Sequence, residues 1–149
     1  MTIFQHSDEK VYFDTCTISR LFDAIKPPNA AAEAEKIQEI IDNRILGGYA
    51  VIGSMVVVSE LADIKDGKKR EAAERRYHNV VTENVELSDH IRARAHELRL
   101  KGLRIMDAAH LAAAEAAGAD YLLTTDAGFV KKCAKPNFTK VMVINPLDF

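Results

Sequence analysis

The sequence predicts an α/β fold in which a central parallel sheet of four to five strands is flanked by helices. Short runs of β-branched, aromatic and aliphatic residues alternate along the chain with longer segments whose apolar residues have helical spacing. The short runs are continuously apolar, which is typical of strands buried on both faces of a parallel sheet. The length of 149 residues fits one domain, over 1–149.

Four strands are expected from these runs, and they cover residues 11–13, 49–52, 121–124 and 141–144. Helical spacing predicts helices over residues 17–24, 30–46, 68–78, 88–100, 107–117 and 126–132, with Asn29 capping the second and Asp107 opening the fifth. In residues 54–64 the valines favour a strand, whereas a cap at Ser54 and the later helix formers favour a helix. For residues 80–87 the sequence does not decide between a loop and a fifth, short extended segment.

Composition and charge exclude several classes of protein. The net charge of −2 gives no global attraction to nucleic acid, so any RNA or DNA binding must use local positive charge. Cys16 and Cys133 have no metal-ligand spacing and are interpreted as reduced thiols. The N-terminus has no apolar core of signal-peptide length, and no apolar run approaches the ~18 residues of a membrane span, so we expect a cytoplasmic protein without membrane contact.

Four acidic residues are expected to meet at one edge of the sheet. Asp14 follows the first strand and Asp126 follows the strand over 121–124, so parallel strands bring both to the same edge. Asp107 begins the helix that leads into the strand over 121–124, which places it at this edge too. Glu60 lies in the segment after the strand over 49–52 and can reach the edge from there.

Each acid alone has a simpler explanation, because aspartate at a strand-to-helix junction often caps the helix and Glu60 could face solvent. The joint pattern favours a shared site. Clustered carboxylates repel one another and disfavour their own ionised forms, and a hard divalent cation removes this repulsion. Oxygen ligands without histidine or cysteine suit Mg²⁺ or Mn²⁺, and such an ion can bind phosphate and activate water.

Residues 11–15, 59–61, 106–114 and 123–126 resemble, in order and spacing, the motifs of PIN-domain ribonucleases. The resemblance covers essentially the whole chain, and the length is similar to that of VapC-type toxins of type II toxin–antitoxin systems. It implies a PIN-like three-layer fold and a Mg²⁺- or Mn²⁺-dependent endoribonuclease that leaves a 5′-phosphate and a 3′-hydroxyl. It also implies an RNA substrate, a small antitoxin as partner and a homodimer.

The resemblance carries the catalytic and metal-binding roles to Asp14, Glu60, Asp107 and Asp126. It carries a supporting role to the hydroxyls of Thr15 and Thr125. Many members have a further Asp two residues after the last acid, where this chain has Gly128. The choice between one and two metal ions therefore stays open.

Other residues have two interpretations each. Arg104, Lys68 and Lys69 are candidate RNA contacts, although the basic stretch over 65–76 is equally typical of a solvated helix face. His110 lies one turn after Asp107 and can approach the site, but packing in an alanine-rich helix is the favoured interpretation.

The rival classes with an acidic sheet edge fit less well. A phosphoaspartate receiver needs an acid doublet and a late lysine that this chain lacks, and an aspartyl phosphatase needs Asp-x-Asp where Cys16 stands. A housekeeping RNA-processing nuclease and a catalytically silent PIN scaffold or RNA-binding protein remain as alternatives to the toxin.

Overall fold

The computed structural model describes residues 8–23 and 28–149. Five strands form its sheet in the order β3-β2-β1-β4-β5, and every neighbouring pair is parallel. The strands are β1 (Lys10–Phe13), β2 (Ala50–Ser54), β3 (Glu83–Val85), β4 (Tyr121–Leu123) and β5 (Met142–Ile144). The predicted parallel sheet is confirmed, and the open segment 80–87 contributes its fifth strand as β3.

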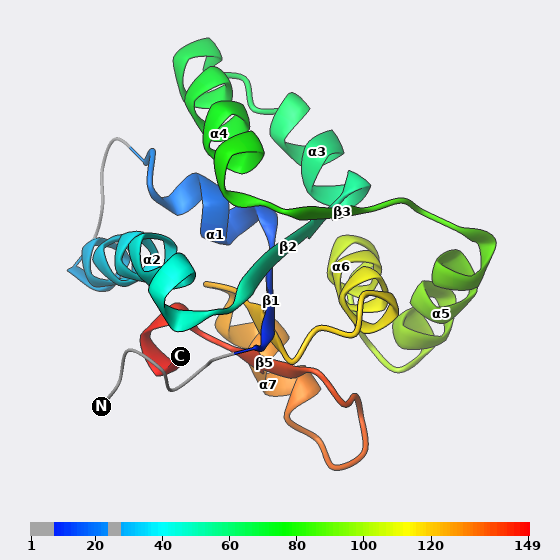
Figure 1. The fold of residues 1–149 in the computed structure, drawn as a ribbon. Coiled ribbons are helices and arrows are strands. Elements are labelled where there is room, and N and C mark those ends of the chain that lie inside the picture. The colour runs from blue at the N-terminus through cyan, green and yellow to red at the C-terminus, as the bar shows by residue number, and fades with distance from the viewer. Residues whose placement is uncertain (1–7, 24–27) are drawn as a thin grey trace.

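Helices cover both faces of this sheet, as the predicted three layers require. They are α1 (Thr15–Arg20), α2 (Pro28–Gly47), α3 (Met55–Ala62), α4 (Gly67–Val80), α5 (Asp89–Leu100), α6 (Ile105–Ala116) and α7 (Ala127–Cys133), and a short 3-10 turn, η2 (Pro146–Asp148), follows β5. Helices α5 and α6 pack on each other on one side of the sheet, while α1 and α2 lie on the other side (Figure 1).

The central strand β1 forms the middle of the hydrophobic core. Val11, Tyr12 and Phe13 are fully buried, because helices cover both faces of the strand. In the register of the sheet, Tyr12 lies between Ile52 of β2 and Leu122 of β4. Truncating a core side chain such as Leu122 to alanine is expected to cost about 2–5 kcal/mol of stability.

The ambiguous segment 54–64 is a helix, not a strand. Ser54 ends β2, and its Oγ accepts a hydrogen bond from the backbone nitrogen of Val56 at 3.2 Å, which caps α3. The valines that favoured a strand instead place Val56 and Val57 in the core. Tertiary packing therefore overrides their local preference for extended structure.

The predicted bounds of three helices were wrong. Helix α2 begins at Pro28, so Asn29 lies inside the helix rather than at its cap. Helix α6 begins at Ile105, two residues before Asp107. The helix predicted over 17–24 is α1, which begins earlier and ends at Arg20, and residue 24 lies outside the described part of the chain.

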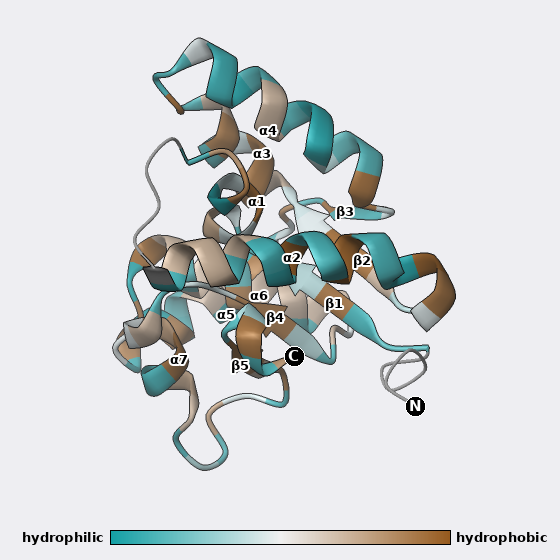
Figure 2. Cartoon of the chain, turned by 90° about the vertical axis from the view of Figure 1, so that its left-hand side faces the viewer, coloured by the Kyte–Doolittle hydropathy of each residue, from teal (hydrophilic) through white to brown (hydrophobic). Residues whose placement is uncertain are grey.

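Polar helices face outward. Helix α4 is mostly hydrophilic along its length and buries Ala73, Tyr77 and Val80 against the rest of the fold (Figure 2). None of the helices in the described part of the chain combines the length and the apolar composition that crossing a membrane requires.

Candidate active site

Asp14 lies at the carboxyl end of β1 and caps α1. Its Oδ1 accepts a hydrogen bond from the backbone nitrogen of Thr17 at 2.9 Å, and the residue is only 3% exposed. Burial raises the pKa of the Asp14 carboxyl, and the charge of His110 and hydrogen bonds from Thr124 and Thr17 offset only part of that rise. The capping role is real, but it leaves a buried charge that would benefit from a cation.

Asp126 follows β4 at the same edge of the sheet. Its Oδ1 accepts hydrogen bonds from the backbone nitrogens of Gly128 and Phe129, at 2.9 and 3.2 Å, and thereby caps α7. Its other oxygen, Oδ2, lies 4.0 Å from Nη1 of Arg104. Because β1 and β4 are neighbouring parallel strands, Asp14 and Asp126 leave the sheet side by side.

Asp107 lies in the first turn of α6 and does not cap it. The cap position is Arg104, which makes no side-chain capping bond, so the capping explanation for Asp107 was wrong. Burial raises the pKa of the Asp107 carboxyl, and the negative charges of Asp126 and Asp14 raise it further, against the opposing charges of His110 and Arg104. The three aspartates therefore lie within electrostatic reach of one another.

Glu60 reaches this region from α3 and is held by two donors. The hydroxyl of Thr15 donates to Oε1 at 2.6 Å, and Nε2 of His110 lies 2.6 Å from the same oxygen. Burial raises the pKa of Glu60, but the hydrogen bond with His110, its charge and the bond from Thr15 outweigh this effect, and the net pKa is lowered. Glu60 is thus an ionised carboxylate at neutral pH.

His110 is buried, as the packing interpretation predicts, and it also contacts an acid of the cluster. Its Nδ1 lies 2.8 Å from the hydroxyl of Tyr12, and the two rings meet edge to face with centroids 5.7 Å apart. The hydroxyl of Tyr12 lies in turn 2.6 Å from Oγ of Ser54. Sequence reasoning did not connect Tyr12 or Ser54 with the site, although a tyrosine in a strand buried on both faces needs a partner for its hydroxyl.

Three threonines lie near the acids, and the supporting roles predicted for two of them, Thr15 and Thr125, stay predictions. Thr15 contacts Glu60, which places it beside the acids as expected. At β4, however, it is Thr124 that is fully buried; its hydroxyl lowers the pKa of Asp14 and its Oγ1 accepts from the backbone nitrogen of Asp126 at 3.1 Å. Thr125, the predicted supporting residue, is half-buried.

The chemistry of these side chains fits a hard divalent cation. All four are carboxylates, and the raised pKa values of Asp14 and Asp107 reflect burial and, at Asp107, the repulsion that such an ion would relieve. Across residues 8–23 and 28–149, however, no three acidic, histidine or cysteine side chains lie close enough together to share one ion as placed. The carboxylate oxygens are thus the right type of donor for Mg²⁺ or Mn²⁺, but these side chains would have to move closer together to bind one ion.

The predicted RNA-contacting residues lie in two places. Arg104 is exposed beside Asp126 at the acidic edge. Lys68 is exposed on α4, whereas Nζ of Lys69 is engaged with Oδ1 of Asp23 at 2.6 Å. Of the three, Arg104 is the one whose position next to the acids suits a phosphate contact.

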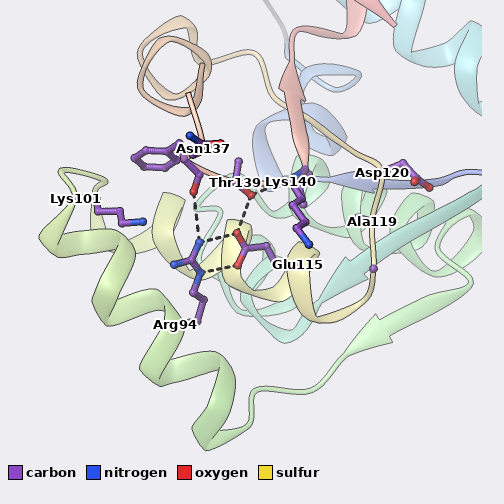
Figure 3. A pocket seen from close by; sticks show the side chains of 11 residues that line it. Arg94, Lys101, Glu115, Ala119, Asp120, Asn137, Thr139 and Lys140 are labelled. Carbon is purple, nitrogen blue, oxygen red and sulfur yellow. Dashed lines mark hydrogen bonds and ion pairs between the residues drawn. The ribbon is translucent and has the colours of Figure 1, made fainter. Parts of the chain in front are cut away.

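A cavity of about 850 Å³ lies at the opposite edge of the sheet, where its lining residues Asp120 and Val141 immediately precede β4 and β5. Arg94 and Glu115 lie side by side in its lining and form a two-bond ion pair, at 2.7 and 3.0 Å, and Thr139 also donates to Glu115 (Figure 3). Because the acids leave the carboxyl ends of the strands, this cavity is not part of their cluster.

Comparison with known proteins identifies the fold. The model of the PIN domain matches residues 11–135, a range that contains all four acids. The chain belongs to the PIN domain family. None of the curated proteins matches the chain.

Solved structures of toxin–antitoxin systems resemble this PIN domain in fold. VapBC2 from Rickettsia felis, bound to a DNA fragment from its promoter, is 16% identical with a TM-score of 0.59, over 91% of this chain and 98% of that chain. A toxin–antitoxin complex from Klebsiella pneumoniae is 22% identical with a TM-score of 0.58, over 91% and 97%. VapC20 from Mycobacterium tuberculosis, a sarcin–ricin loop cleaving toxin, is 18% identical with a TM-score of 0.62, over 88% and 98%.

Proposed function

We propose that this PIN domain is a Mg²⁺- or Mn²⁺-dependent endoribonuclease and the toxin of a toxin–antitoxin pair. The observation that carries the proposal is the approach of Asp14, Asp107 and Asp126, from three separate segments, to one edge of the sheet. There the charges of Asp126 and Asp14 raise the pKa of Asp107. A bound divalent cation would relieve this repulsion, and carboxylates with perturbed pKa values at one edge of a sheet are typical of functional sites.

Asp14, Glu60, Asp107 and Asp126 would hold the ion. Once bound, a divalent cation supplies an activated water and neutralises charge on a phosphodiester. The protein's own part is to fix the carboxylates. Backbone nitrogens of α1 and α7 hold one oxygen each of Asp14 and Asp126, and Thr15 with His110 holds Glu60.

Arg104 is the best-placed group for the substrate itself. Its guanidinium is exposed and lies 4.0 Å from Oδ2 of Asp126, next to the acids rather than buried among them. An RNA phosphate approaching the cation would meet this positive charge, which offsets the negative charge of the carboxylates. The chain carries a net charge of −2, so such local contacts have to supply the attraction to RNA.

The toxin assignment, the antitoxin partner and the homodimer are part of this proposal. The likeness of fold to VapC20 and to structures of VapBC toxin–antitoxin systems supports the toxin and its antitoxin partner. The homodimer rests only on the resemblance of the sequence to VapC-type toxins. A toxin that cuts cellular RNA works where that RNA is, so the cytoplasm remains the expected location. Toxicity on expression, relieved by coexpression of a small neighbouring gene, is the expected genetic result.

The direct test is RNA cleavage by the purified chain with Mn²⁺ or Mg²⁺, compared with Asp14→Asn and with excess chelator. We expect cleavage by the wild type only when the ion is present, with products that carry a 5′-phosphate and a 3′-hydroxyl. A folded wild type that cuts no RNA under any of these conditions would instead support the silent scaffold or RNA-binding protein.

A further inference from the structure

We propose that His110 is a positioning residue. The buried hydroxyl of Tyr12 orients its imidazole, which binds one carboxylate oxygen of Glu60 and leaves the other oxygen for the metal ion. The inference rests on the proposed function, in which Glu60 is one of the ligands. Histidine is not an ordinary ligand in carboxylate sites for Mg²⁺, so the inference gives His110 a role beside the ion rather than on it.

The observation behind it is a continuous chain of hydrogen bonds through the interior. Oγ of Ser54 lies 2.6 Å from the hydroxyl of Tyr12, which lies 2.8 Å from Nδ1 of His110. On the far side of the ring, Nε2 lies 2.6 Å from Oε1 of Glu60. The chain joins residues from β1, β2, α3 and α6, which are far apart in sequence.

The direction of the hydrogen bond between His110 and Glu60 follows from which of the two groups can donate. A carboxylate only accepts, so Nε2 of His110 carries the hydrogen and donates it to Oε1. The hydroxyl of Tyr12 can either donate to Nδ1 or accept from it, so it holds the ring in the same orientation in both charge states. Tyr12 therefore fixes where the Nε2–H points.

The two carboxylate oxygens of Glu60 therefore have different surroundings. Oε1 receives two donors, from Thr15 and His110, whereas Oε2 takes part in no hydrogen bond with the described residues. A carboxylate held in this way presents a single oxygen, which suits a ligand to one position of an octahedral ion. Partners of this kind orient ligands and tune metal affinity.

The hydrogen-bonded side chains that position Glu60 are buried. The side chain of His110 is 4% exposed, and Tyr12 and Ser54 are fully buried. Ser54 also caps α3, the helix that carries Glu60, so the same residue sets both the helix start and the tyrosine hydroxyl. The long side chain of a glutamate has several rotatable bonds, and this framework limits the conformations that would otherwise compete with metal binding.

A purely structural role for His110 makes a different prediction. His110→Leu takes one partner from the Tyr12 hydroxyl and one donor from Glu60, so a purely structural role predicts some loss of stability. That loss would be the same with and without the ion, and Mn²⁺ affinity would not change. Glutamine, by contrast, can place an amide N–H near the position of Nε2, so it tests the donor itself.

The experiment measures Mn²⁺ affinity by titration calorimetry, together with thermal unfolding without metal, for wild type, His110→Gln, His110→Leu and Tyr12→Phe. Tyr49→Phe is the matched control, because it removes the hydroxyl of another buried tyrosine, which contacts Ile40 away from the acids. We expect His110→Leu to weaken Mn²⁺ binding about 10- to 100-fold, with Tyr12→Phe weakened less. His110→Gln keeps most of the affinity, and Tyr49→Phe keeps all of it.

A second readout counts water on the ion. Luminescence lifetimes of bound Tb³⁺, measured in H₂O and D₂O, report the water molecules in its coordination sphere. If Glu60 is no longer directed to the ion in His110→Leu, about one additional water takes its place. A change in packing alone would leave this number as it is in the wild type, so the count separates positioning from stability.

The outcomes are distinguishable. If the wild type binds Mn²⁺ and His110→Leu has the same Mn²⁺ affinity and the same number of bound waters, this inference is overturned and the proposed function stands. If His110→Leu fails to fold, equal affinities in Tyr12→Phe and Tyr49→Phe would overturn it instead. A folded wild type that binds no Mn²⁺ would overturn the proposed function and this inference together.

Discussion

The backbone nitrogen of Asp14 donates a hydrogen bond to the carbonyl oxygen of Leu123 across 3.3 Å. The hydroxyl of Thr17 donates to the same carbonyl at 2.8 Å. These two bonds tie the end of β1 and the start of α1 to the end of β4. Together with the parallel pairing of β1 and β4, they place Asp14 and Asp126, more than a hundred residues apart, at the same edge of the sheet.

Replacing Asp107 or Asp126 by asparagine is expected to lower RNA cleavage by about 100-fold or more, because the cation loses a charged ligand and phosphate charge is no longer offset. Folding should change little: asparagine at 126 can still accept the capping bonds, and Asp107 caps nothing. Single-turnover cleavage rates and thermal unfolding check both parts. Asp120, an exposed acid at the other edge of the sheet, is the control, and Asp120→Asn should cleave at the wild-type rate.

Asp14→Asn is expected to raise the stability of the metal-free protein at neutral pH. Burial raises the folded-state pKa of Asp14, so its ionisation costs stability as the pH rises through that pKa, and the cost is absent in acid. Asparagine keeps the cap and removes the charge. Urea unfolding at about pH 7.5 and about pH 4 should therefore show a gain that shrinks in acid. A variant that is equally destabilised at both values would contradict the assigned cause.

Arg104→Ala is expected to weaken RNA binding and to reduce the salt dependence of that binding by about one ion equivalent, as for the loss of one phosphate contact. The pKa of Asp107 should rise further, because the charge of Arg104 now lowers it. Binding to a labelled RNA over a range of salt concentrations measures the effect. Arg99→Ala removes an exposed arginine from α5 and serves as the comparison. Equal salt slopes in the two variants would assign Arg104 no role at the phosphate.

Gly53→Ala is expected to destabilise the fold by about 1–3 kcal/mol through overcrowding. A Cβ at this position in β2 would collide with the ring and hydroxyl of Tyr77, which is 4% exposed and donates to the carbonyl of Ser54. Denaturant unfolding checks the size of the effect, and Gly67→Ala, whose Cβ would meet only a flexible arginine at 3.6 Å, should cost much less.

The parallel sheet and the position of Asp14 and Asp126 after the carboxyl ends of its strands were predictable, because both follow from continuous apolar runs and from where each acid stands relative to a strand. The burial of the Thr124 hydroxyl was not predictable. Neighbouring residues at the end of a strand point to opposite sides, so Thr124 is buried while Thr125 is half-buried, and the supporting role of Thr125 stays a prediction. The register that decides it comes from pairing with β1 and β5.

Contacts between distant helices were also beyond the reach of the sequence. His110 and Glu60 are 50 positions apart, and their bond depends on how α3 and α6 pack across the end of β1. The spacing of three between Asp107 and His110 placed both on one helix face, but it could not say what that face would meet. The start of α6 at Ile105 was missed because Arg104 carries none of the usual capping signals.

The most direct test of the account is a crystal of the chain soaked in Mn²⁺, with anomalous scattering recorded to locate the ion. We predict a peak at the carboxyl ends of β1 and β4, with carboxylate oxygens of Asp14, Asp107 and Asp126 about 2.0–2.4 Å from it and Oε2 of Glu60 directed towards it. A peak elsewhere, or no peak at a concentration that supports RNA cleavage, would contradict the claim that these acids exist to hold a metal ion.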